Sequence, residues 1–324
     1  MSPERQALVD AAAVVPHTDA DGLAAGAVAL RARGEDAGAA ILLGRGATPF
    51  AAGAALPAGP LAILDWGIRP TTRPGLVVDH HAPEAVILDG RVGGPSGPIA
   101  VTSYGELPDT PTAPLMRRIV AEAPAWLAAV GAVGDLGDAG FALPECAGAA
   151  PKTAIRRLVS LVNAPRRLPD GPVRTARGSS WSTSSASAVL RDPRIAELED
   201  AKAAWRAEFD RVVRTAPRMV GEAVALLRFS SPAQVHPLVA TTWARRLAPR
   251  IVLAANDGYL GAGTVNFSVR GGVGDLRRVL RAALPSAGDA FEFAHGHDRA
   301  TGGSLPDADF ERLLANLAAL APTS

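Results

Sequence analysis

Short apolar runs alternate with helical patterns in the first half of the chain. The runs that predict strands are Ala11–Val15, Ala39–Leu43, Leu61–Leu64 and Leu76–Val78, and the stretches that predict helices are Gly22–Arg33 and Ala125–Val133. Short, continuous apolar strands between helices are typical of a parallel sheet that is covered on both faces. The first half is therefore predicted to be a doubly wound α/β domain.

The pattern changes in the middle of the chain and then begins again. Residues 165–187 are rich in Pro, Gly, Ser and Arg, which favours a loop, and Ile195–Met219 predicts one long charged helix up to Pro217. The elements predicted after Gly221 are strands at Ala223–Phe229, Ile251–Ala255 and Leu260–Val269, and helices at His236–Leu247, Gly274–Leu284 and Asp307–Leu320. We expect a first domain over residues 1–190, a connecting helix over 191–220 and a smaller α/β domain over 221–324, with a cleft between the two domains.

Composition and charge narrow the class of protein. The chain has 324 residues, of which 48% are hydrophobic and 20% charged, enough for a real core and unlike a disordered chain. The net charge of +1 provides no overall field for nucleic acid, so an anionic substrate must meet local positive charge. The single cysteine, Cys146, excludes an intrachain disulfide and a cysteine zinc site. No apolar run approaches the ~18 residues of a membrane span, and we expect a cytoplasmic protein without a membrane partner.

Acidic and imidazole side chains follow several of the predicted strands. They are His17, Asp19 and Asp21 after the first strand, Asp65 after Leu61–Leu64, the triplet Asp79, His80 and His81 after Leu76–Val78, and Asp135 after the helix Ala125–Val133. Ligands gather at the carboxyl ends of parallel strands, so these segments converge on one edge of the sheet. This donor set suits Mn²⁺ or Mg²⁺, with zinc less favoured by so many oxygens. Two ions about 3.5–4 Å apart are a standard device for phosphoester cleavage.

These motifs resemble those of the DHH-family phosphoesterases with a DHH-associated C-terminal domain, a group that contains RecJ-type exonucleases, nano-RNases and cyclic-dinucleotide phosphodiesterases. The resemblance runs through essentially the whole chain. It implies that His17 and Asp19 hold one metal ion, that Asp21, His80 and Asp135 hold the other, and that Asp65 bridges them. It further implies that His81 touches the scissile phosphate and that Asp79 orients a neighbouring histidine.

The second domain carries two further motifs of the same family. Asn266-Phe267-Ser268-Val269-Arg270 resembles a strand that ends in a phosphate-binding arginine, and residues 296–303 resemble a glycine-histidine substrate loop. The substrate-binding residues that the resemblance implies are Ser268, Arg270, Gly296, His297, Arg299 and Thr301. The chain departs from the pattern at Ala294-His295, where the family usually has more glycine.

Alternative roles remain open for some of these residues. Asp138 could replace Asp135 as a ligand, although the motif position favours Asp135. His236 at a predicted helix start fits a structural role better than a catalytic one. The basic stretch formed by Arg166, Arg167, Arg174 and Arg177 fits a solvated loop or, less readily, a contact to a nucleic acid backbone.

These observations predict a two-metal phosphodiesterase that uses Mn²⁺, with Mg²⁺ as an alternative, and acts as an exonuclease on single-stranded DNA or RNA or on short oligonucleotides. The main alternative is hydrolysis of a small nucleotide such as 3′-phosphoadenosine 5′-phosphate or a cyclic dinucleotide. A catalytically inactive replication-associated scaffold is disfavoured because His or Asp occupies every expected ligand position. A homodimer or a replication or repair partner is also considered.

Overall fold

The computed structural model describes residues 1–36, 39–178, 181, 185–272, 274–287 and 293–319, without the side chains of 177, 178 and 295–297. The chain forms two compact units. Unit 1 contains Met1–Arg166 and Asp170–Lys202, and unit 2 contains Arg167–Pro169 and Ala203–Ser324. Each unit is described by itself below.

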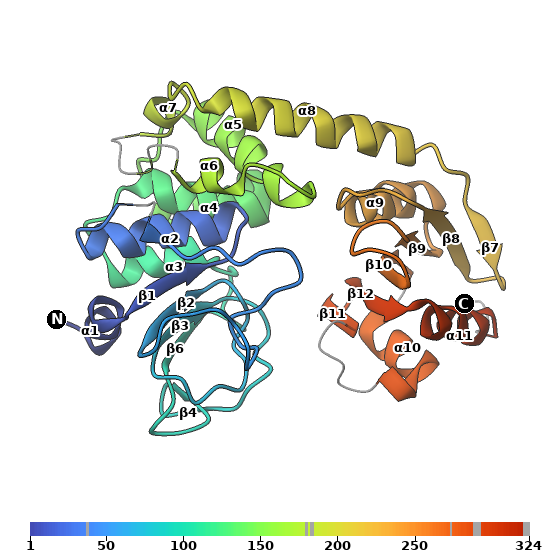
Figure 1. Ribbon diagram of the computed structural model, residues 1–324, viewed down its shortest axis with the longest axis horizontal. Coiled ribbons are helices and arrows are strands. Elements are labelled where there is room, and N and C mark those ends of the chain that lie inside the picture. Colours follow the sequence, from blue (N-terminus) through green and yellow to red (C-terminus); the bar gives the residue numbers. More distant parts are fainter. Residues whose placement is uncertain (37–38, 179–180, 182–184, 273, 288–292, 320–324) are drawn as a thin grey trace. The chain divides into compact units, whose positions relative to one another are not determined.

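Unit 1 is built on a six-stranded sheet in the order β1-β2-β3-β6-β5-β4. Figure 1 labels β1, β2, β3 and β6 next to one another. The strands are β1 (Ala13–Pro16), β2 (Leu61–Leu64), β3 (Gly75–Asp79), β4 (Ile87–Leu88), β5 (Arg91–Val92) and β6 (Ile99–Thr102). The strands β1, β2, β3 and β6 pair in parallel, and the short strands β4 and β5 add an antiparallel edge. The parallel strands therefore end together at one edge, and the predicted α/β class is confirmed.

Helices lie on one side of this sheet, some packed against its strands and the others packed on those helices. They are α1 (Pro3–Asp10), α2 (Ala20–Ala32), α3 (Thr112–Ile119), α4 (Ala125–Leu136), α5 (Lys152–Val162), α6 (Val173–Gly178) and α7 (Ala186–Val189), with 3₁₀ turns at Gly137–Ala142, Pro144–Cys146 and Pro165–Arg167. Val14, Leu64 and Val78 point into the core beneath them, whereas Val15 and Ile63 face the opposite side. That second face is covered as predicted, but by loop residues such as Ile41, Phe50 and Leu56 rather than by helices.

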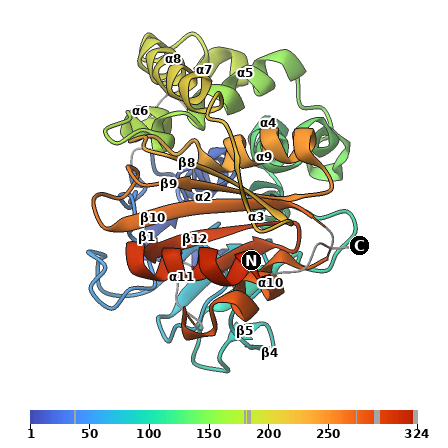
Figure 2. The same cartoon turned by 90° about the vertical axis from the view of Figure 1, so that its right-hand side faces the viewer.

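Unit 2 contains a second six-stranded sheet in the order β11-β12-β10-β9-β8-β7. Its strands are β7 (Arg218–Val220), β8 (Val224–Phe229), β9 (Ile251–Asn256), β10 (Thr264–Gly271), β11 (Phe293–His297) and β12 (Ala300–Pro306), and only β8 and β9 pair in parallel. The helix α9 (His236–Leu247) and the end of α8 (Ile195–Val212) cover one face. The helices α10 (Leu276–Ala283) and α11 (Asp307–Ala318) cover the other (Figure 2), with a 3₁₀ turn at Pro285–Ala287 between them.

Several predicted boundaries are wrong. Residues 39–43 form no strand: Ile41 N donates to Val14 O of the first strand at 2.9 Å, but the described residues of the segment do not extend this contact into a ladder. The helix α4 continues to Leu136, so Asp135 lies in its last turn rather than after it. The helix α8 ends at Val212, and the following residues include the short strand β7. Two short helices, α6 and α7, lie in the segment predicted as a loop.

Among the helices that the structure describes, none has both the length and the apolar composition needed to cross a membrane.

Candidate metal centre

The edge where the parallel strands of unit 1 end brings the predicted ligands together. His17 follows β1 directly, Asp19 is the N-cap of α2, and Asp65 follows β2. Asp79 is the last residue of β3, so His80 lies just beyond the strand. This placement is the one expected for ligands in a parallel α/β sheet.

Three groups of side chains place their possible ligand atoms within 4.8 Å of one another. The groups are His17 with Asp19 and Asp65, Asp21 with His80 and Asp135, and Asp65 with His80 and His81. Asp65 belongs to two of the groups, and His80 also belongs to two. The third group places His81 beside Asp65 and His80.

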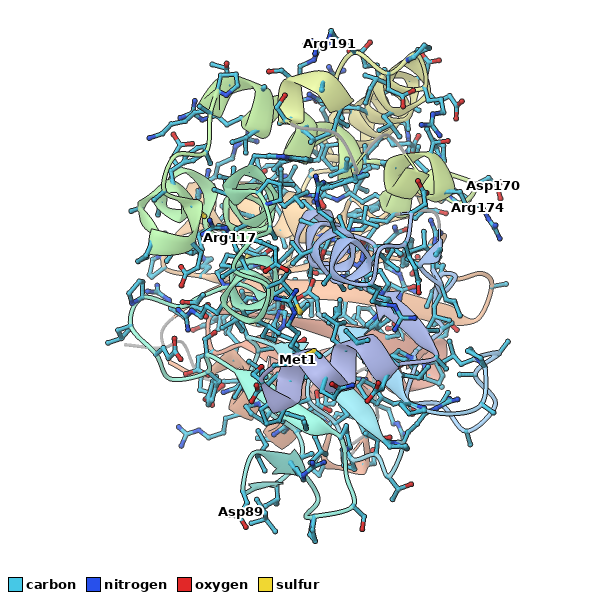
Figure 3. The ribbon with its side chains drawn as sticks, turned by 90° about the vertical axis from the view of Figure 1, so that its left-hand side faces the viewer. Met1, Asp89, Arg117, Asp170, Arg174 and Arg191 are labelled. Carbon is cyan, nitrogen blue, oxygen red and sulfur yellow. The ribbon has the colours of Figure 1, made fainter. Side chains whose placement is uncertain are left out.

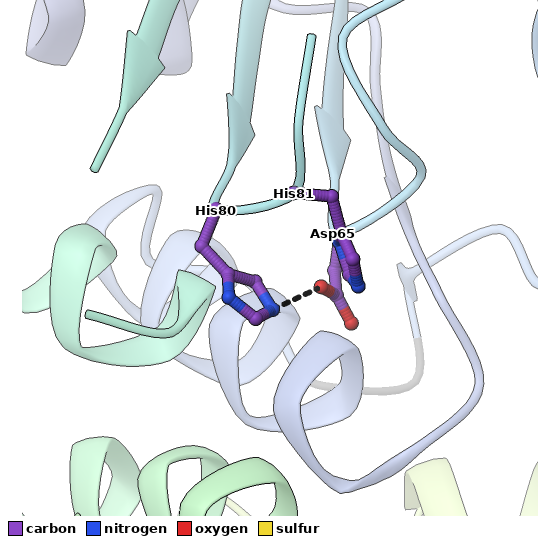
Figure 4. A group of neighbouring side chains, drawn as sticks. All are labelled: Asp65, His80 and His81. Atoms are coloured by element: carbon purple, nitrogen blue, oxygen red, sulfur yellow. Dashed lines mark ion pairs between the residues drawn. The ribbon is translucent and has the colours of Figure 1, made fainter. Parts of the chain in front are cut away.

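Asp65 lies between His17 and His80, which belong to different ligand groups. Its Oδ2 is 3.7 Å from His17 Nδ1, and its Oδ1 is 3.9 Å from His80 Nε2 (Figure 4). The backbone of Asp65 has φ 68°, an uncommon left-handed conformation that Asp tolerates better than most residues. The hydroxyl of Thr112 donates to Oδ1 at 3.1 Å. The carboxylate is thus held with its two oxygens directed to different neighbours.

Asp21 is fully buried against the start of α3. Its Oδ2 accepts a hydrogen bond from Thr112 N at 2.6 Å, and its Oδ1 accepts one from Ala113 N at 2.8 Å. A helix N-terminus stabilises an anion, which fixes this carboxylate in place. The close approach of α4 depends on Gly131, because a Cβ there would lie 2.1 Å from Asp21 Oδ1.

The imidazole of His80 has carboxylates on both of its nitrogens. Nδ1 lies 3.3 Å from Asp109 Oδ2, and Nε2 lies 3.0 Å from Asp135 Oδ2. Although Asp135 is near, Nε2 is buried without a hydrogen bond of acceptable geometry. An imidazole nitrogen that points at a carboxylate oxygen without bonding it suits a cation held by both atoms.

Asp79 holds the backbone and the imidazole of His81. Its Oδ1 accepts from His81 N at 2.7 Å and contacts His81 Nδ1 at 2.9 Å, while its Oδ2 accepts from Gly67 N at 2.6 Å. Burial would raise the pKa of Asp79, but these contacts lower it. Burial has the opposite effect on an imidazole and would lower the pKa of His81, but the hydrogen bond to Asp79 outweighs it and raises this pKa. The pair therefore favours a cationic His81 beside an ionised Asp79.

The buried carboxylates are crowded enough to resist ionisation together. Burial, followed by repulsion from Asp135, raises the pKa of Asp21 to about 8. Burial and repulsion from Asp19 and Asp21 raise the pKa of Asp65 well above its ordinary value. Burial would lower the pKa of His80, but Asp135 and Asp21 outweigh that effect and raise this pKa to about 10. Positive charge among these groups would relieve the repulsion.

The donor set therefore fits divalent cations. Carboxylate oxygens and imidazole nitrogens converge from several elements, the Nε2 of His80 is buried without a hydrogen bond, and the crowded carboxylates require compensation. These residues would hold two ions, one near His17 and Asp19 and one near Asp21 and His80, with Asp65 reaching both.

In unit 2, the pairing of β10 with β12 places the predicted substrate residues on different faces of the sheet. Ser268 and Arg270 point to one face of β10, whereas Thr301 pairs with Val269 and is buried on the core side. The Arg270 guanidinium is partly buried and bonds the carbonyls of Val269 and Thr301 at 2.9 and 3.0 Å. Arg299 is exposed in the turn between β11 and β12. Gly296 and His297 lie on β11, but the side-chain positions of His295 and His297 fall outside the described residues.

The residues with open alternatives are also placed. Asp138 pairs with Arg156 at 2.7 Å at the surface and joins none of the three ligand groups. Arg166 Nη2 lies 3.7 Å from Asp19 Oδ2. Burial would raise the pKa of Asp19, but the charges of His17 and Arg166 outweigh it and hold this pKa well below its ordinary value. Arg174 is exposed at the surface of unit 1 (Figure 3).

The remaining two arginines and His236 complete these placements. Arg167 stacks on Trp205 in unit 2, and the side chain of Arg177 lies outside the described residues. His236 is buried at the start of α9, where burial and then Arg270 lower its pKa to about 3. A buried, neutral imidazole at that position agrees with a structural role.

Sequence reasoning missed Asp109 and Thr112, which support His80 and Asp65. Both follow β6, a parallel strand whose run Ile99–Thr102 was not recognised. The available signal was that Asp109 and Thr112 are polar residues after an apolar run, because residues after a parallel strand reach the same edge of the sheet as the ligands.

Comparison with known proteins bears on the fold. No family model and no curated protein sequence matches the chain. The Mn²⁺ complex of RecJ from Thermus thermophilus superposes with a TM-score of 0.63 at 19% identity, over 98% of this chain and 55% of RecJ, so this chain spans about half of that protein. An exonuclease RecJ bound to manganese gives a TM-score of 0.58 at 18% identity over 99% and 96% of the two chains. The DHH domain of a protein described as a member of a family of ribosomal proteins gives 0.62 at 14%, over 98% and 89%.

The chain therefore has the two-unit α/β fold of these RecJ and DHH-domain structures. More particularly, the chain has a RecJ-like fold, which confirms the resemblance drawn from its motifs.

We predict that the metal-free protein loses stability as the pH rises from 7 to 9. The pKa values of about 8 for Asp21 and about 10 for His80 exceed their ordinary values of 3.8 and 6.5, so the folded state binds more protons than the unfolded state there. Stability present at lower pH is then lost as the pH passes through these values. Urea unfolding in EDTA measures this slope. Saturating Mg²⁺ should flatten it, and equal slopes with and without Mg²⁺ would contradict the assignment.

Replacement of Asp109 should weaken metal binding without unfolding the protein. Asp109→Asn removes the anionic partner of His80 Nδ1 and should raise the dissociation constant for one Mn²⁺ by about 10–100-fold. Isothermal titration calorimetry measures the two affinities, and Asp89→Asn at the unit 1 surface is the control. An unchanged Mn²⁺ affinity would show that Asp109 does not support the ligand.

Proposed function

We propose that this chain is a two-metal-dependent phosphodiesterase that acts as an exonuclease on single-stranded or short oligonucleotides. The observation that carries the proposal is Asp65, whose two oxygens are directed toward His17 and His80 from different ligand groups. A carboxylate in that position suits the bridging ligand of a two-ion site. When bound, the ions would supply Lewis acidity toward the phosphoryl oxygen and lower the pKa of a water molecule.

The metal ligands we assign are His17, Asp19, Asp21, Asp65, His80 and Asp135. The four carboxylates suit either Mn²⁺ or Mg²⁺, because both ions prefer oxygen donors. We propose Mn²⁺, with Mg²⁺ as the alternative. The RecJ structures that share this fold were determined with Mn²⁺ and with Mg²⁺, which supports the same choice here.

His81 is the residue we assign to the reacting phosphate. Its side chain is 45% exposed, and Asp79 fixes its Nδ1, so the far side of the ring faces away from that carboxylate. The raised pKa favours an imidazolium, which donates a charge-assisted hydrogen bond to a phosphoryl oxygen. Negative charge that builds on the phosphate in the transition state would strengthen this bond. Asp79 then acts as a positioning residue for His81.

Substrate binding in unit 2 is assigned to Ser268, Arg270, Gly296, His297 and Arg299, on the motifs they form. Arg270 and Ser268 share one face of β10, where Ser268 is buried and the Arg270 guanidinium bonds two backbone carbonyls, so their assignment rests on the motif. The buried side chain of Thr301 faces the core, so we assign it a structural role rather than substrate contact. We propose single-stranded nucleic acid as substrate, because a phosphate at a chain end, held by these residues, would suit exonucleolytic attack.

Removal of the bridging carboxylate should abolish hydrolysis. Asp65→Asn should lower turnover by at least about 100-fold, since the loss of an outer partner of a ligand already costs about 10–100-fold. The assay incubates the protein with Mn²⁺ and oligonucleotides of two to about thirty nucleotides, labelled at either end, beside 3′-phosphoadenosine 5′-phosphate and a cyclic dinucleotide. The product ladder gives the polarity of digestion.

The control for this variant is Asp138→Asn, which removes a surface carboxylate paired with Arg156. It should leave turnover unchanged. Full activity of Asp65→Asn would refute the two-metal proposal, and turnover of the small nucleotides alone would refute the oligonucleotide substrate.

A further inference from the structure

The helix α10 in unit 2 presents three arginines on its outer side. Leu276, Leu280 and Ala283 of this helix pack into the core. Arg277, Arg278 and Arg281 are spaced so that 281 lies one turn from each of the other two, and we call them the arginine face of α10. These three residues, with Asp275 and Ala282, line a shallow pocket of about 380 Å³.

The positive charge of this face is only partly compensated. Arg277 pairs with Asp298 and lies 3.7 Å from Asp275, which caps the helix through the backbone N–H groups of residues 277 and 278. Among the residues that the structure describes, neither Arg278 nor Arg281 forms an ion pair. Two guanidiniums are thus available on a chain whose net charge is only +1.

The arginine face is continuous with the turn between β11 and β12. Leu276 N donates to Asp298 O at 2.7 Å, and the ion pair between Arg277 and Asp298 ties the same two segments. The turn also carries Arg299, which is exposed and which we assign to the substrate. A strand bound at this turn would therefore have positive charge beside it along α10.

The lining of the pocket indicates which polyanion fits. It contains guanidiniums, one carboxylate and one alanine, and it offers no aromatic or large aliphatic side chain to receive an anchor residue of a protein partner. A guanidinium presents a planar fork that matches phosphate oxygens, and phosphate contacts carry no base preference. These features favour a nucleic acid backbone over an acidic protein.

We propose that the arginine face of α10 binds backbone phosphates of a single-stranded nucleic acid, beyond the nucleotides held at the β11–β12 turn. The inference rests on the proposed function and deepens it, because it makes strands longer than a few nucleotides the preferred substrate. Each phosphate neutralised by an arginine releases counterions, so binding through this face depends on salt.

The test compares salt slopes. Fluorescence anisotropy in EDTA, where hydrolysis does not interfere, measures the affinity of the full chain for a labelled single strand of about 20 nucleotides between about 50 and 200 mM salt. The double variant Arg278→Gln with Arg281→Gln should reduce the slope of log K against log salt by about 1.4, since each phosphate contact to a single strand contributes about 0.7. The matched control is Arg245→Gln with Arg250→Gln, two exposed arginines of unit 2 outside the arginine face, which should leave the slope unchanged.

Two results would overturn the proposal. One is an equal slope for the double variant and the wild type, and the other is displacement of the strand by a polyglutamate of the same charge at equal concentration. Cleavage of oligonucleotides by the wild type with Mn²⁺ is measured in parallel. Its absence would refute the proposed function, whereas equal slopes in an active enzyme would refute the arginine face alone.

Discussion

Repulsion among buried carboxylates is the constraint on which the site of unit 1 depends. Asp21 and Asp65 are withdrawn from water, which raises the pKa of both, and repulsion from neighbouring carboxylates adds to the effect: Asp135 acts on Asp21, and Asp19 and Asp21 act on Asp65. Burying such charges without compensation costs several kcal/mol per ion. A fold that nonetheless places them within a few ångströms of two imidazoles is built to hold positive charge at that point.

The architecture of unit 1 meets this constraint with ordinary elements. Parallel pairing of β1, β2 and β3 makes their carboxyl ends coincide, so that consecutive strands deliver His17, Asp65 and Asp79 to one edge. The start of α3 then offsets the charge of Asp21 with two backbone N–H groups. The hydrophobic cores on the two faces of the sheet hold these elements in register and leave the ligands at its edge.

Much of this could be predicted from the sequence because the relevant signals are local. An apolar run followed by His or Asp marks both a buried strand and its polar end, which is why the ligands of unit 1 could be chosen. Contacts between distant segments could not be predicted in the same way. Asp109 reaches His80 only because the short strand β6 lies beside β3, and that strand is weakly apolar. Thr301 was assigned to substrate by its motif, but the register of β12 turns its side chain to the core.

The central claim is that two cations occupy positions on either side of Asp65. Anomalous diffraction at the manganese absorption edge, from crystals grown with Mn²⁺, tests it most directly. The account predicts two peaks about 3.5–4 Å apart, one within bonding distance of His17 and Asp19, the other of Asp21, His80 and Asp135, with Asp65 contacting both. A single peak, or peaks that do not contact Asp65, would contradict it.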